Sequence, residues 1–193
     1  MAIKTFSSGE VLTAADTNTY LTNSGLVYIT TATASNTASA LNIQSCFSAT
    51  YDNYRIEITN IRSSSNSAIY FQMLNGATPV TTGTYNWAYV GISTLNVSTN
   101  SQAASQTSGF IGVNTNSSTD TGNSATFDIL NPYLARRTIL LGQAIGINAG
   151  LNGFDIRNGG ANHESPASYD GIRLLTGLGN ITFTARVYGY RQA

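Results

Sequence analysis

The end of this sequence alternates apolar and polar side chains with a period of two. Ile181, Phe183, Ala185 and Val187 occupy every second position, and the residues between them are polar. Successive side chains of a β-strand point to opposite faces of a sheet, so this pattern predicts a strand with one buried and one solvent-facing side. The pattern restricts the fold more than any other feature, because the same period returns along most of the chain.

Further segments with strand character are separated by turns rich in Gly, Ser, Asn and Thr. They are residues 26–30, 54–59, 69–74, 85–92, 110–113, 125–130, 138–147 and 171–175. No helical period of about ten residues follows Leu21, so the helices that join parallel strands are not expected and the sheets should be antiparallel. The strand number and the domain size predict an all-β fold, an antiparallel β-sandwich of jelly-roll type.

The residues before this region follow a different pattern. Thr13, two alanines and Asp16 have the character of a helix start, with a hydroxyl N-cap and an acid in the first turn. We therefore expect a short helix over residues 13–21 in an N-terminal arm, residues 1–25, followed by a sandwich domain, residues 26–193. The apolar side chains through which this arm would dock are Phe6, Val11, Leu12, Tyr20 and Leu21.

The composition narrows the classes of function. Only 9% of the residues are charged, the net charge is zero, and 67 of the 193 residues are Ser, Thr or Asn. A neutral chain has no long-range attraction to phosphate, which argues against binding nucleic acid. The shortage of Lys and Glu argues against a helical bundle. No apolar run approaches the roughly 18 residues of a membrane span, so no membrane insertion is expected.

Residues that could carry catalysis or bind a metal are few. The chain has one cysteine, Cys46, and one histidine, His163, and its carboxylates are scattered along the sequence. Asp155 and Asp170 flank one long polar stretch and are the best available pair for glycoside hydrolysis. The pattern favours a protein that is not an enzyme and that uses no cofactor and no metal.

Two polar stretches, residues 93–108 and 148–170, are expected to be long exposed loops. Loops on a rigid sandwich are frequent binding sites, so Asn158, Asn162 and His163 are candidate contacts for a ligand or partner. The alternative is that both loops only cap the ends of the sheets or fill a subunit contact. A solvated loop position is the favoured interpretation of His163.

An aromatic stripe runs along the segment 85–92. Tyr85, Trp87 and Tyr89 lie on one face of the predicted strand. If that face is exposed, the rings form a stacking platform for sugars or a partner surface; if it faces inward, they belong to the core. We favour the core or a subunit interface.

Three segments carry a resemblance to a known group of proteins. Residues 6–21, FSSGEVLTAADTNTYL, resemble an opening motif of structural and tail-appendage proteins of tailed bacteriophages, including marine and cyanobacterial phages. Residues 47–56, FSATYDNYRI, and the closing VYGYR of residues 187–191 resemble the β-rich body of the same group. The middle of the chain is not matched.

The resemblance implies a virion protein, assembled in the host cytoplasm. It implies a β-sandwich module, often a homotrimer, that binds other virion proteins of the tail or capsid through its N-terminal segment. Such modules serve as tail-fibre or head-fibre parts, and host-surface carbohydrate is an expected ligand. The alternatives are a capsid decoration protein that stabilises the shell, a polysaccharide-degrading enzyme of tailspike type, and a cellular lectin-like module.

Overall fold

The structure is a computed structural model that describes residues 7–11, 13–16, 25–94, 98, 100–115, 122–148 and 153–191. Within these residues nearly all regular structure is β, and the helix α1 covers only Ala14–Asp16. The rest of the helix predicted over residues 13–21 lies outside the described residues. The described helix is far too short to span a bilayer.

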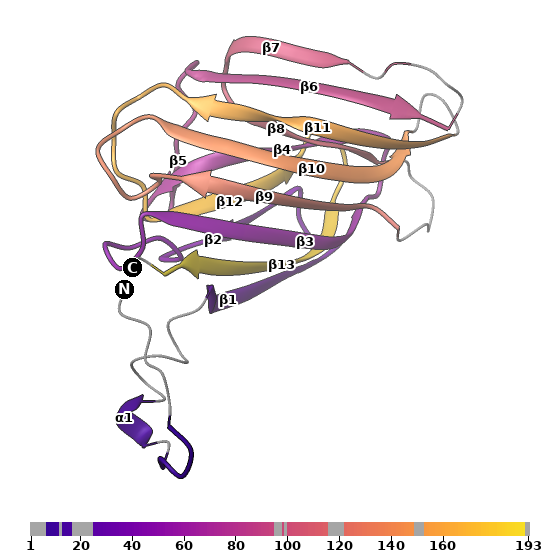
Figure 1. Cartoon of the computed structure of the whole chain (residues 1–193). Helices are drawn as coiled ribbons and strands as arrows, with labels where there is room; N and C mark the ends of the chain where they lie inside the picture. The colour runs from indigo at the N-terminus through magenta and orange to yellow at the C-terminus, as the bar shows by residue number, and fades with distance from the viewer. Residues whose placement is uncertain are drawn as a thin grey trace.

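Two antiparallel sheets lie face to face, as Figure 1 shows. The larger sheet has the order β1 (Leu26–Ser35), β13 (Ile181–Tyr190), β3 (Asn53–Ser63), β9 (Ser124–Leu130), β10 (Thr138–Asn148), β11 (Gly153–His163), β6 (Tyr85–Ser93) and β7 (Ser101–Gln106). The smaller sheet has the order β2 (Ala40–Ile43), β12 (Gly171–Thr176), β4 (Ser67–Asn75) and β5 (Thr78–Pro79), and β8 (Gly109–Thr115) also pairs with β4.

Four of the strand pairs are nested in sequence, each inside the one before, as in one long hairpin. They are β1–β13, β2–β12, β3–β9 and β4–β8. Successive pairs lie alternately in the larger and the smaller sheet. A long hairpin rolled up in this way is a jelly roll, so the predicted all-β sandwich of jelly-roll type is confirmed. We call these eight strands the body.

The remaining strands of the larger sheet are insertions in this plan. β6 and β7 follow β4 and β5, and β10 and β11 follow β9. Together β10, β11, β6 and β7 continue the larger sheet beyond β9, and we call them the extension. Its inner face packs on β8, so the body and the extension share one interior.

The core of the body consists of large apolar side chains that are fully buried. They include Tyr54, Ile56, Phe71 and Phe183. Burial of such side chains is the main favourable contribution to folding, about 25 cal/mol for each Å² of apolar surface. The alternation read from the sequence is retained, because Ile181, Phe183, Ala185 and Val187 all face this core.

All nine predicted segments are strands, but the sequence underestimated their number. The strands β2, β5, β7 and β11 were not predicted. Because β7 lies within residues 93–108 and β11 within residues 148–170, the prediction of exposed loops was wrong over these strands. The error matters for function, since β11 lies in the middle of the extension.

Candidate functional site

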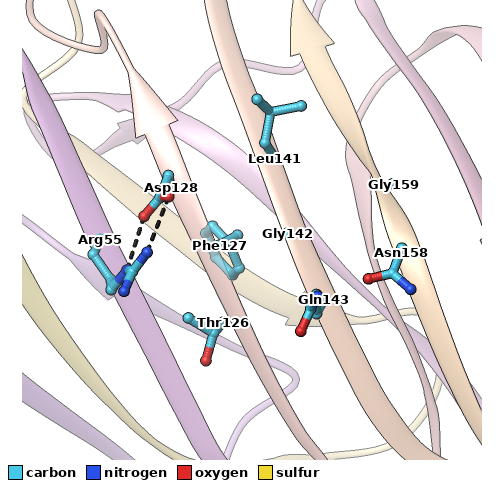
Figure 2. A pocket seen from close by; sticks show the side chains of 9 residues that line it. All are labelled: Arg55, Thr126, Phe127, Asp128, Leu141, Gly142, Gln143, Asn158 and Gly159. Atoms are coloured by element: carbon cyan, nitrogen blue, oxygen red, sulfur yellow. Dashed lines mark hydrogen bonds and ion pairs between the residues drawn. The ribbon is translucent and has the colours of Figure 1, made fainter.

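A groove runs across the outer face of the larger sheet, where β3, β9, β10 and β11 lie side by side (Figure 2). Its volume is about 650 Å³, within the range of roughly 300–1,000 Å³ that is typical of small-ligand sites. We call it the polar groove, and it is lined by Arg55, Thr126, Phe127, Asp128, Leu141, Gly142, Gln143, Asn158 and Gly159.

An ion pair forms one end of the polar groove. The Arg55 guanidinium donates from Nε to Asp128 Oδ1 at 2.9 Å and from Nη2 to Asp128 Oδ2 at 3.1 Å, a bidentate geometry. The Tyr190 hydroxyl donates to the same Oδ1 at 2.6 Å. Burial works to raise the pKa of Asp128, but these hydrogen bonds outweigh it and the pKa is lowered. The carboxylate is therefore ionised and its charge is balanced by Arg55.

Neutral polar side chains continue the polar groove beyond the ion pair. In the sheet register, Thr126 lies beside Gln143, and Gln143 lies beside Asn158. All three side chains are exposed on the outer face, and Figure 2 shows them on neighbouring strands. Among the described residues none of these three side chains is hydrogen-bonded to protein. Their donors and acceptors are therefore available to a ligand.

Glycines bring the strands close together under the polar groove. Gly142 and Gly159 are directly paired. A Cβ on Gly159 would lie 2.2 Å from the Ala88 carbonyl oxygen, and a Cβ on Gly142 would lie 2.4 Å from the Thr126 carbonyl oxygen. Any side chain at these positions would collide with the backbone of the next strand, so the floor of the groove depends on glycine.

Exposed apolar side chains lie next to the polar groove, on β6 and β11. Val90, Ile92, Phe154 and Ile156 are between 39% and 64% exposed, and we call this surface the apolar ledge. Ile92 and Ile156 are direct neighbours in the register. Grouped apolar side chains on a surface commonly mark a contact with a partner.

The aromatic stripe belongs to the core, which is the interpretation favoured from the sequence. Tyr85 and Tyr89 are buried, and Trp87 is half-buried. The rings of Trp87 and Tyr89 pack on Phe110 of β8. The Tyr85 hydroxyl donates to the Val80 carbonyl and accepts from the Met73 amide. Tyr85 and Tyr89 are therefore not available to an external ligand.

His163 is not a solvated loop residue, and that expectation was wrong. It ends β11 and is fully buried. Its Nε2 lies 2.8 Å from the Thr84 hydroxyl and its Nδ1 lies 3.1 Å from the Tyr169 hydroxyl. Burial lowers the pKa of His163, against a smaller opposing effect of the Glu164 carboxylate. The histidine is a neutral, hydrogen-bonded part of the interior and does not form a surface contact.

The other two candidate contacts on β11 both lie on its outer face. Asn158 lines the polar groove, whereas the half-buried Asn162 accepts a hydrogen bond from the Asn86 amide at 3.0 Å. Val11 is 78% exposed, which is compatible with docking. Phe6, Leu12, Tyr20 and Leu21 lie outside the described residues.

The structure does not support a hydrolytic site at the carboxylate pair that the sequence offered. Asp155 faces the interior and is paired with Arg157, with 2.8 Å between Asp155 Oδ2 and Arg157 Nη2. Asp155 lies near one end of β11, about 25 Å along the strand from His163 at the other end. Asp170 lies beyond the His163 end, where its carboxylate accepts a hydrogen bond from the Gly76 amide. Among the described residues no three His, Cys, Asp or Glu side chains cluster as metal ligands would.

Sequence reasoning did not find the polar groove itself. Arg55, Asp128 and Gln143 stand at polar positions of predicted strands, but their side-by-side placement depends on the register. Comparison with models of protein families, with curated proteins and with solved structures finds no match for this chain.

Proposed function

We propose that this chain is a non-enzymatic structural protein of a bacteriophage virion. It is an exterior appendage or fibre module, docked by residues 1–25 and in contact with glycans of the host surface. The observation that carries the proposal is the outer face of the larger sheet, where the neutral polar groove adjoins the apolar ledge. Such a face suits contacts with uncharged partners. The resemblance of residues 6–21 to virion proteins supplies the context.

Docking through the N-terminal segment is tested by deleting residues 1–25. The register starts at Leu26, which pairs with Tyr190, so the deletion leaves every described strand intact. We expect a truncated protein with an unchanged melting temperature that is no longer incorporated into particles. Normal incorporation of the truncated protein would show that docking uses another surface.

We further propose that copies associate with one another through the apolar ledge, as a homotrimer. Four exposed apolar side chains on two neighbouring strands support this contact, because their burial between copies removes apolar surface from water. Light scattering should show an oligomer that Ile92→Lys together with Ile156→Lys dissociates. The matched control is Leu178→Lys, at an equally exposed apolar side chain away from the ledge. A wild-type monomer, or an oligomer that the double variant leaves intact, contradicts the proposal.

A capsid decoration protein is the second candidate, because the apolar ledge would equally serve contacts with a shell and with neighbouring copies. The two roles differ in location and in host binding. Antibody labelling of intact particles should place an appendage protein on the tail or on a head fibre and a decoration protein on the capsid surface. Binding of the purified protein to whole host cells is expected only for the appendage.

A further inference from the structure

We propose that the polar groove is a binding site for a neutral saccharide, the ring of an uncharged hexose or N-acetylhexosamine. The inference deepens the proposed function, on which it rests for the source of the ligand, a host-surface glycan. The site itself is argued from the side chains that line it.

The charge of the polar groove points to an uncharged ligand. Its one cation, Arg55, is bound in bidentate fashion to its one anion, Asp128. Both side chains are about one third exposed, so they remain accessible to a ligand while neutralising each other. A phosphate, sulfate or carboxylate would have to compete with Asp128 for the guanidinium. A neutral hydroxyl group meets no such competition.

The hydrogen-bonding groups suit hydroxyl groups, which donate and accept at the same atom. Arg55 donates two of its five N–H bonds to Asp128, and Asp128 Oδ2 accepts only one hydrogen bond among the described residues. The amides of Gln143 and Asn158 each offer both a donor and an acceptor. Donors and acceptors therefore alternate along the polar groove from β3 to β11.

The walls and floor complete the match with a sugar ring. Leu141 is 54% exposed beside Asp128 and offers an apolar surface to the C–H face of the ring. On the other side of Gln143, the register places Ile145 next to Ile156. Polar groups thus lie in the middle of this part of the outer face, and apolar side chains lie on either side of them. Between the outward side chains, the backbone of Gly142 and Gly159 lies at the floor of the groove (Figure 2).

The test is a titration of the full chain with single neutral saccharides, followed by NMR of the side-chain amides. The probes are glucose, galactose, mannose and N-acetylglucosamine, with sialyllactose and a sulfated disaccharide as anionic probes. We expect at least one neutral probe to bind with a dissociation constant of about 1 mM and to shift the Gln143 and Asn158 amide signals. Raising the salt concentration should change this constant less than about twofold, since no net charge is neutralised.

The matched variants are Gln143→Ala with Asn158→Ala, compared with Gln102→Ala on β7. Gln102 is an exposed amide of the same sheet outside the polar groove. The double variant should bind about tenfold or more weakly, because two hydrogen-bonding groups are lost, and the control should bind like the wild type. Thermal unfolding of all variants checks that the fold is retained.

Three results would overturn the inference. They are no binding of any neutral probe at about 10 mM, unchanged binding by the double variant, and a preference for the anionic probes with a steep salt dependence. Measuring whether the double variant is incorporated into particles distinguishes a failure of the saccharide inference from a failure of the proposed virion role. A variant that is incorporated but binds no saccharide contradicts neither proposal, whereas a wild-type chain that binds saccharide but never enters a particle contradicts the virion role alone.

Discussion

The body and the extension share the larger sheet, but different kinds of side chain from the two regions face the common interior. In the body, the inward positions carry large apolar side chains such as Tyr54, Ile56 and Phe183. In the extension, β6 adds the buried rings of Tyr85 and Tyr89, but the inward positions of β11 carry the Asp155–Arg157 ion pair, two glycines, an alanine and His163. Large apolar surfaces fix one packing arrangement, whereas buried polar groups are costly unless each finds a partner. The body therefore accounts for the fold, and the extension supplies the strands that form the polar groove and the apolar ledge.

The two Arg–Asp pairs of the larger sheet give the sharpest test of this difference. Asp155 and Arg157 lie inside the extension, with side chains 4% and 5% exposed, while Arg55 and Asp128 lie on the outer face. Asp155→Ala should lower the free energy of unfolding by about 3–5 kcal/mol, because it leaves the Arg157 guanidinium buried without its carboxylate. Asp128→Ala, the matched control, should cost less than about 1 kcal/mol. Urea unfolding measures both, and equal losses would contradict the buried role of Asp155.

A glycine inside the extension should tolerate a side chain less well than a glycine at a turn of the body. A side chain at Gly159 meets the backbone of β6, so Gly159→Ala should cost about 1–3 kcal/mol of stability. At Gly177 the nearest atom is the Ser67 hydroxyl oxygen at 3.2 Å, which can move aside. Gly177→Ala should therefore change the urea midpoint little. A Gly159→Ala variant as stable as the wild type would show that the strands of the extension can separate without cost.

Acidification should weaken the extension before it affects the outer ion pair. Because the pKa of His163 is lowered by burial, the unfolded chain takes up a proton below about pH 6.5 that the folded chain resists. Stability is therefore full above that pH and falls as the pH decreases, by no more than about 1.4 kcal/mol per pH unit. Melting temperatures between pH 8 and pH 5 measure the slope, which His163→Gln should flatten. The lowered pKa of Asp128 places its own contribution at more acid pH.

Two natural probes show whether the body and the extension unfold together. The single tryptophan, Trp87, lies in the extension, and the single cysteine, Cys46, lies in the body beside β2. Burial raises the pKa of the Cys46 thiol to about 12, so alkylation should require unfolding. Because β8 packs on both regions, we expect the fluorescence and alkylation midpoints in urea to coincide. An earlier tryptophan transition would show that the extension opens as a separate unit.

The body could be predicted from the sequence because its strands alternate apolar residues that face inward with polar residues that face outward. Tyr54, Ile56 and Ile58 face inward and the residues between them face outward. In β11 the sense is reversed, with Phe154 and Ile156 exposed while Asp155 and Arg157 are buried. A strand with charged residues inside and the sequence NGGAN near its end has the composition of a loop, which is why β11 and the burial of His163 were missed.

The other missed strands have simpler causes. β7 has the sequence SQAASQ, without a β-branched or aromatic residue, and β2 and β5 are short. The polar groove could not be predicted, because Arg55 and Asp128 are 73 positions apart and meet only through the register of β3 with β9. The sequence showed which positions are polar, but it did not show which residues are neighbours on adjacent strands.

The pairing of Leu26 with Tyr190 places the first and the last strand residues of the chain at the same end of the body. The chain joins the body and leaves it at the same end, where the Arg191 amide donates to the Gly25 carbonyl at 3.3 Å. The turns of residues 64–66 and 177–180 lie at the other end of the same strands. If the N-terminal segment is held on a surface, a dye or peptide placed after residue 191 stays close to that surface, and one placed near residue 65 is carried away from it. Energy transfer between a label at each position and a labelled surface would thus report the orientation of every bound copy.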